Sequence, residues 1–205
     1  MTLQSLLDYF ISLEGLASVL AIVYLMLAIK QNVWCWVAGI ASTAIFMYVV
    51  FNASLYMEAG LQVFYIVISF YGIWQWKYGG KDEKNNPDEL KVSRWPLKNH
   101  IVAVATIVAL ALVSTYLLEK YTDAALPFID SLTTWGGIVT TYMVAKKIFE
   151  NWHYWFVIDS ISIYLFYSRE LYIFAGLFAI YLVLIVFGFR EWKRSMQTQA
   201  ADVNV

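Results

Sequence analysis

Two stretches of the sequence decide the predicted fold: residues 55–77, LYMEAGLQVFYIVISFYGIWQWK, and residues 171–193, LYIFAGLFAIYLVLIVFGFREWK. They lie 116 residues apart and are identical at ten of 23 positions, which is more than a shared apolar bias would produce. Upstream, Asn32 to Trp36 matches Asn151 to Trp155 at a separation of 119, which implies a slip of three residues between the two matches. These similarities predict an internal duplication of the chain.

The composition is that of an integral membrane protein. Of the 205 residues, 61% are hydrophobic, 18% aromatic and only 14% charged, whereas soluble domains carry about 25% charged residues. The net charge of −1 argues against binding of nucleic acid through overall basicity, and the single cysteine excludes a disulfide framework. Seven apolar runs can cross a bilayer as helices once their flanks are included, so we expect an all-α membrane fold. The runs are residues 15–29, 34–51, 56–76, 101–118, 132–145, 152–167 and 171–189.

The basic residues predict the orientation of these spans. Twelve of the 14 fall on the side that holds the loops after spans 1, 3 and 5 and the C-terminus, and only Lys120 and Arg169 fall on the other side. Because basic residues stay on the cytoplasmic side, we expect the N-terminus outside and the C-terminus inside. The predicted segments are a first repeat at 15–77, a cytoplasmic loop at 78–99, a linker helix at 101–118, a second repeat at 131–193 and a tail at 194–205.

The duplication also predicts a class of function. Spans 1–3 repeat as spans 5–7, and because span 4 joins them, the two copies should run parallel. Parallel repeats are found in transporters that bind substrate near the middle of the membrane, where the copies meet. A duplicated scaffold or sensor that transports nothing is the alternative from another class. An enzyme is not expected, since the sequence has no HExxH motif, nucleophile–base pair or aspartate dyad.

Two acidic residues, Glu58 and Asp159, stand well inside the apolar runs, where a charge is costly and usually functional. Asp159 lies about 10–13 Å along its helix from Trp152, close to the expected midplane. Trp152, Trp155, Asp159 and Ser162 share one helical face. Because tryptophan faces attract cations by about 2 kcal/mol where water is excluded, this face fits an aromatic organic cation.

The third span carries a polar stripe that the second copy did not keep. The stripe and its counterparts 116 residues later are Glu58/Phe174, Gln62/Phe178, Tyr65/Tyr181 and Ser69/Ile185. Only the tyrosine is shared, so the duplication predicts a site of unequal halves. Such a site suits an asymmetric organic solute better than a symmetric ion pore.

Several of these residues also have a purely structural interpretation. Trp152 could belong to the aromatic belt at the membrane interface, and Gln62 and Ser69 could bridge helices by hydrogen bonds. Glu58 could be interfacial, or it could act as a gate near the outer surface. The two histidines lie near cytoplasmic helix ends without other metal ligands, so neither a metal nor another cofactor is expected.

These motifs resemble a known family. Residues 151–155, NWHYW, followed by Asp159, are similar to the NWxxW signature of the PnuC nicotinamide riboside transporters. Residues 59–65 and 71–76, AGLQVFY and YGIWQW, resemble the second block of that family. The resemblance implies seven spans arranged three-plus-one-plus-three like a full-length SWEET, and a homotrimer among the lipids of the bacterial inner membrane. It also implies facilitated diffusion of an unphosphorylated vitamin, which a cytoplasmic kinase then traps.

The resemblance further implies a substrate site. It places Trp152 and Trp155 against the substrate ring and assigns polar contacts to Gln62 and Tyr65. The remaining candidates are Asp159, Ser69, Asn151, Trp36, Tyr181 and Ser162, with Glu58 as a candidate gate. Riboside carriers tend to have asparagine at the position of Asp159, and a carboxylate suits the N–H donors of an aminopyrimidine. Thiamine is therefore the expected substrate, as in the family's PnuT carriers, and nicotinamide riboside is the alternative.

Overall fold

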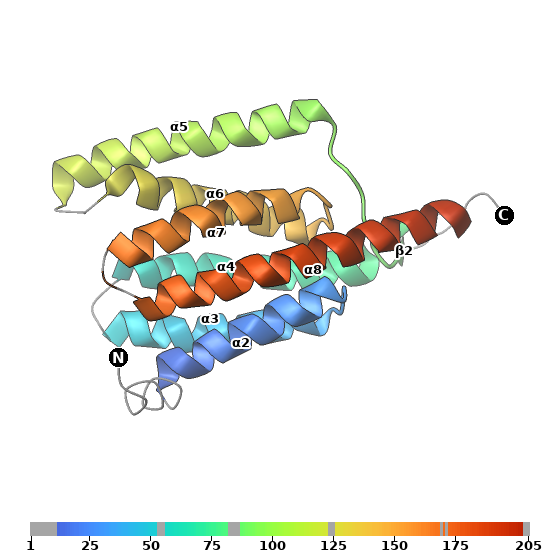
Figure 1. The fold of residues 1–205 in the computed structure, drawn as a ribbon, viewed down its shortest axis with the longest axis horizontal. Coiled ribbons are helices and arrows are strands. Elements are labelled where there is room, and N and C mark those ends of the chain that lie inside the picture. The colour runs from blue at the N-terminus through green and yellow to red at the C-terminus, as the bar shows by residue number, and fades with distance from the viewer. Residues whose placement is uncertain are drawn as a thin grey trace. The chain divides into compact units, whose positions relative to one another are not determined.

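A computed structural model of the chain describes residues 12–52, 56–81, 87–122, 126–168, 170 and 172–202. These residues form seven helices and one short antiparallel pair of strands, β1 (Gly80–Lys81) and β2 (Pro87–Asp88), in the loop after the third helix (Figure 1). The helices are α2 (Leu13–Ile29), α3 (Trp34–Asn52), α4 (Tyr56–Tyr78), α5 (Leu97–Tyr121), α6 (Pro127–Ala145), α7 (Asn151–Ser168) and α8 (Tyr172–Asp202). The apolar runs predicted all seven, and the largest difference is that α8 continues well beyond residue 189.

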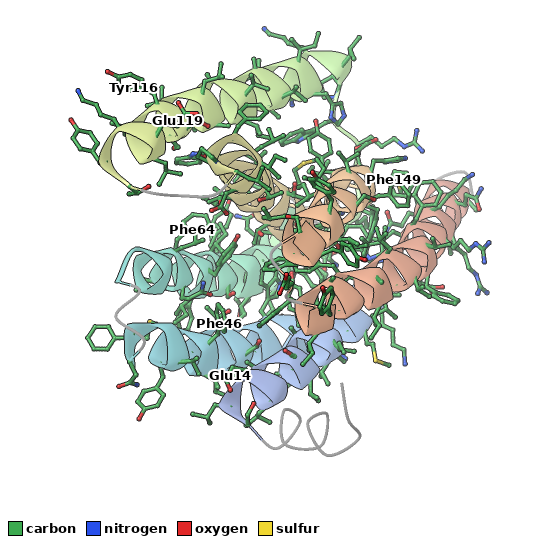
Figure 2. The ribbon with its side chains drawn as sticks, turned by 60° about the vertical axis from the view of Figure 1, so that its left-hand side comes forward. Glu14, Phe46, Phe64, Tyr116, Glu119 and Phe149 are labelled. Carbon is green, nitrogen blue, oxygen red and sulfur yellow. The ribbon has the colours of Figure 1, made fainter. Side chains whose placement is uncertain are left out.

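The helices present apolar side chains on their exposed faces. On α5, Leu97, Ile101 and Tyr116 are 74%, 61% and 62% exposed, and Figure 2 shows Tyr116 projecting from that helix into the surroundings. Soluble monomers rarely leave large contiguous apolar areas open to water. Among the described residues, Leu97–Tyr121 and Tyr172–Gln199 are long and apolar enough to cross a membrane, and Leu13–Ile29 and Trp34–Val49 are shorter apolar helices. The surface is thus consistent with the membrane class that the composition predicts.

The helices group into two compact units, Met1–Leu90 and Lys91–Val205. In the first unit, α3 packs against both α2 and α4. In the second unit, α7 packs against both α6 and α8, and α5 packs against α6. In the set α2, α3 and α4, the middle helix α3 contacts both of the others, and α7 does the same in the set α6, α7 and α8.

The turns that precede α3 and α7 have the same backbone geometry. Gln31 and Lys147 lie 116 residues apart, and both adopt a left-handed backbone with φ of 54° and 47°. The backbone bonds also correspond: Gln31 N donates to Ala28 O and Asn32 N to Leu27 O, while Lys147 N donates to Val144 O and Ile148 N to Met143 O. This is the Schellman pattern that ends many helices, usually with glycine at the left-handed position. Because neither residue is glycine, the sequence carried no signal for these turns.

A tryptophan covers a glycine in each unit, again at positions 116 residues apart. Trp36 of α3 lies so close to Gly72 of α4 that a Cβ added to the glycine would overlap the indole, and Trp152 of α7 lies in the same way over Gly188 of α8. Each indole also meets a second ring edge-on. The centroids of Trp36 and Trp76 are 5.6 Å apart, and those of Trp152 and Trp192 are 5.4 Å apart. These four tryptophans are buried, so each cluster forms the packed contact between two neighbouring helices.

The two clusters correct the predicted register of the duplication. Trp36 occupies the place of Trp152, rather than that of Trp155, so the separation stays at 116 and the predicted slip of three residues is absent. The match at 119 was misleading because Asn32 lies in the turn before α3, whereas Asn151 is the first residue of α7. In the corrected register, the counterpart of Trp155 is Gly39.

Replacing Gly188 with alanine should destabilise the protein. The new methyl group would displace the Trp152 indole from its contact with α8, and overpacking of this kind costs about 1–3 kcal/mol. Gly176→Ala on the same helix is the matched control, because a Cβ there would meet nothing within 4 Å. Thermal unfolding of both variants in detergent tests this: equal melting temperatures would contradict the packing described here.

Candidate functional site

The middle helix of the second unit carries the main candidate residues on one face. Trp155, Asp159 and Ser162 follow one another at spacings of four and three residues on α7, so their side chains lie along one side of that helix. The carboxyl group of Asp159 lies about 6 Å along the helix axis from the position of Trp155. Asp159 and Ser162 are buried, whereas the Trp155 indole is half-buried. The exposed part of that ring remains available to a ligand.

Asp159 has an unusual environment for a carboxylate. Only 3% of the residue is exposed, and its Oδ1 accepts no hydrogen bond from any described residue. Helix α7 contains no lysine or arginine that could compensate the charge. A buried acceptor without a donor costs about 1–3 kcal/mol, more if it is charged. The carboxylate is therefore a cost to the ligand-free fold, and its Oδ1 can still accept a hydrogen bond from a bound molecule.

The beginning of α7 has a different character. Asn151 is fully buried, and its Nδ2 donates a hydrogen bond of 2.6 Å to the backbone oxygen of Ile148. Trp152 is 2% exposed and its ring lies between Gly188 and Trp192. Asn151 therefore holds the turn before α7, and Trp152 packs α7 against α8. The two tryptophans of the NWxxW motif thus differ, since Trp152 packs inside the unit and Trp155 is partly open.

In the first unit, the predicted polar stripe lies on α4. Gln62 and Ser69 are buried, and Tyr65 is half-buried. The Ser69 hydroxyl donates a hydrogen bond of 2.7 Å to the backbone oxygen of Tyr65 on its own helix. Ser69 therefore offers mainly its oxygen lone pairs to any ligand, whereas the amide of Gln62 can both donate and accept.

The remaining candidates are divided between packing and partly open positions. Trp36 is 1% exposed and belongs to the packed cluster with Gly72 and Trp76. Tyr181 of α8 is half-buried and meets the Phe178 ring edge-on, with centroids 5.5 Å apart. The side chain of Glu58, the candidate gate, lies outside the described residues.

The corrected register adds two pairs on α3 and α7 to those that the sequence comparison had already found on α4 and α8. The candidates and their counterparts in the other unit are Trp155/Gly39, Asp159/Thr43, Gln62/Phe178 and Ser69/Ile185. Gly39 of α3 is close to the Tyr24 ring, which would lie 3.1 Å from an added Cβ. A large ring is therefore accommodated at this position of α7 and excluded at the equivalent position of α3. The duplication has therefore diverged at the predicted site positions.

A second polar cluster lies at the beginning of α5 and α7. Nδ1 of His100 and the Tyr154 hydroxyl form a hydrogen bond of 3.0 Å, and their rings stack with centroids 5.8 Å apart. Glu150 accepts a hydrogen bond of 3.2 Å from the backbone N–H of Trp95. Within the described chain, no three histidine, cysteine or acidic residues come together as metal ligands. The sequence had not indicated this cluster, because its members come from three separate segments.

Comparisons with known proteins agree with the resemblance of the motifs. The sequence model of a family described as nicotinamide mononucleotide transporter matches residues 11–194. The chain is 25% identical to the riboflavin/roseoflavin transporter RibM of Streptomyces davaonensis, over 87% of this chain and 83% of that protein. It is 22% identical to the nicotinamide riboside transporter PnuC of Escherichia coli, over 92% of this chain and 88% of that protein.

The fold has a solved counterpart. A crystal structure of the vitamin B3 transporter PnuC matches with a TM-score of 0.71 at 21% sequence identity. The match covers 91% of this chain and 82% of that chain. At this level of identity the likeness concerns the path of the backbone, and the roles of side chains must be argued from the residues themselves.

Replacing Asp159 with leucine should stabilise the ligand-free protein. The change removes a buried carboxylate oxygen that has no donor among the described residues, and relief of about 1 kcal/mol raises the melting temperature of a chain of this size by about 3 °C. Asp159→Asn is the matched variant, since it keeps the shape of the side chain while it removes the charge and replaces one acceptor oxygen with an N–H donor group. Thermal unfolding without ligand measures the effect, and a clear loss of stability in Asp159→Leu would show that the carboxylate supports the fold.

Proposed function

Because the chain belongs to the nicotinamide mononucleotide transporter family, we propose that it carries a nicotinamide nucleoside across the membrane, with nicotinamide riboside as the leading substrate. The observation that carries this proposal is the face of α7 on which the half-buried Trp155 precedes the buried Asp159. Nicotinamide riboside has a flat, positively charged ring, which an indole attracts and a carboxylate neutralises. Its amide and ribose hydroxyls also supply the hydrogen-bond donors that Asp159 lacks.

The unphosphorylated form of the substrate fits these residues better than the mononucleotide. A phosphate group requires basic side chains or free backbone N–H groups. Helix α7 contains no lysine or arginine, and the only one in α4 is Lys77, in its last turn. A phosphate would also be repelled by Asp159.

Thiamine, the substrate favoured by the sequence, is not supported by the relatives. Those described above are named for transport of nicotinamide riboside or riboflavin. The argument from Asp159 does not separate thiamine from nicotinamide riboside, since both contain a cationic aromatic ring and N–H donors. Riboflavin is the second candidate because RibM is 25% identical to this chain, although its neutral ring system gives the Asp159 carboxylate no cation to pair with.

We further propose transport by facilitated diffusion. Asp159 is the only buried carboxylate among the described residues, and no buried basic partner accompanies it in α7. Coupled carriers need a second site or a proton relay, for which acidic and histidine chains are typical. Phosphorylation of the imported vitamin by a cytoplasmic kinase would then trap it and make uptake effectively one-way.

The proposal also includes the orientation of the chain in the membrane, the order of its repeats and its oligomeric state. Twelve of 14 basic residues support a cytoplasmic C-terminus and an external N-terminus in the inner membrane of a bacterium. Parallel repeats in a three-plus-one-plus-three order, and assembly as a homotrimer, follow from the resemblance to the family. A non-transporting scaffold or sensor is the alternative, and it predicts no saturable uptake of any vitamin.

Purified protein in liposomes should take up radiolabelled nicotinamide riboside with saturation and without an added sodium or proton gradient. In liposomes held at zero membrane potential, which is needed because the riboside is itself a cation, an uncoupler should leave the initial rate unchanged, since no proton moves with the substrate. Liposomes without protein are the control for leakage. Uptake that collapses with the uncoupler in vesicles without any trapping enzyme would contradict facilitated diffusion.

The two tryptophans of the motif should respond differently to truncation. Trp155→Ala should weaken riboside binding about 30-fold, since it removes a cation–π contact of about 2 kcal/mol, and should leave thermal stability nearly unchanged. Trp152→Ala should lower the melting temperature, because it empties the contact with Gly188. Trp34→Ala, at an indole that is 62% exposed, is the neutral control. If Trp155→Ala lost only stability, the scaffold interpretation would be favoured.

A further inference from the structure

A groove of about 490 Å³ runs between α5 and α7 in the second unit. In the described part of the chain α5 packs along α6 and meets α7 at one end through the His100–Tyr154 pair, so α6 forms the floor and the other two helices form the walls. The floor includes Gly136, and the Ile158 side chain of α7 would lie 3.1 Å from a Cβ added there. From His100 to Val108 the α5 wall is about 12 Å long, which accommodates a large part of an acyl chain.

Polar and apolar groups are segregated along this groove. Its walls beyond the first turn consist of aliphatic side chains: Val104, Ile107 and Val108 of α5, and Val157, Ile158 and Ile161 of α7. Thr133 on the floor is also apolar in effect, because its hydroxyl donates to backbone oxygens of its own helix at 3.0 and 3.1 Å. The remaining polar residues, His100, Glu150, His153 and Tyr154, all gather at the end where α5 and α7 begin.

An arginine outside the groove lining lies beside this polar end and offsets its carboxylate. The extended segment before α5 is fixed there by backbone pairing of Ser93 with Lys147 and Phe149, at 3.0 and 2.8 Å. This pairing brings Arg94 beside Glu150, with Nε and Oε1 3.8 Å apart, so the one carboxylate of the groove is already balanced. Arg94 remains 61% exposed, and the two histidines add further donors.

We propose that this groove binds one anionic phospholipid, with an acyl chain along α6 and the phosphate at Arg94 and His100. Basic pockets between membrane helices on the cytoplasmic side bind anionic headgroups, and the predicted topology places this end of the groove on that side. Trp95 lies edge-on to His100 with ring centroids 5.7 Å apart, and an indole at this level suits the headgroup region. The lipid would fill the space between α5 and α7. This lipid site is separate from the proposed substrate site and does not depend on which substrate is transported.

Native mass spectrometry of the delipidated full-length protein can test this binding. Titration with phosphatidylglycerol or phosphatidylcholine of the same acyl chains should show one tightly held lipid per chain. Phosphatidylglycerol should be preferred about five-fold, the effect of one basic residue near an anionic group. Equal retention of the two lipids by the unmodified protein would overturn the proposal.

Groove-filling variants locate the bound lipid. Val104→Trp and Val157→Trp, at positions that are 50% and 56% exposed, should each lower lipid retention at least five-fold without changing riboside binding. Val102→Trp is the control, since Val102 is 56% exposed on the same α5 helix but does not line the groove. Two filling variants on different helices guard against misfolding of either one. Unchanged lipid retention in both, or a change in the number of chains per particle instead, would assign the groove to something other than lipid.

A headgroup variant tests the charge. Arg94→Gln should reduce the preference for phosphatidylglycerol about five-fold. Lys91→Gln is the matched control, because Lys91 is exposed in the same segment but is not the residue beside Glu150, and it should leave the preference unchanged. Equal effects of the two variants would show that general surface charge, rather than this site, attracts the lipid.

Discussion

The contact on which each unit depends is a tryptophan ring lying directly on a backbone. Trp36 over Gly72 and Trp152 over Gly188 let two helices approach to the thickness of one indole, which any side chain larger than hydrogen would prevent. In a membrane, where lipid competes equally for apolar surfaces, such close packing at small residues is the main source of helix association. A second tryptophan, placed edge-on in both units, completes the contact.

This shared scaffold leaves other positions free to diverge. One turn beyond Trp152, the second unit has Trp155 where the first has Gly39, and then Asp159 where the first has Thr43. On the outer helices the polarity is reversed, since Gln62 and Ser69 of α4 correspond in sequence to Phe178 and Ile185 of α8. The duplicated packing therefore supports unequal polar surfaces, which is what recognition of an asymmetric cation requires.

The sequence predicted the helices well because a membrane span needs a long apolar run, and that run is visible in the residues themselves. It missed the extension of α8 to Asp202, since that part contains Arg190, Glu191 and Lys193 and is no longer apolar. It also missed the Schellman turns, where Gln31 and Lys147 take the place of glycine. The burial of Asp159 was foreseen from its position, whereas the packing role of Trp152 required knowing that Gly188 lies beneath its ring.

The central claim is that the polar face of α7 recognises a cationic nicotinamide nucleoside. Isothermal titration of the purified protein with nicotinamide riboside, with thiamine and riboflavin titrated in parallel, tests it most directly. The account predicts saturable binding of one riboside per chain, at least ten-fold tighter than riboflavin, whose neutral ring lacks the cation that Asp159 would pair with; this ratio corresponds to about 1.4 kcal/mol. Tight binding of riboflavin or thiamine with no detectable binding of the riboside would contradict it.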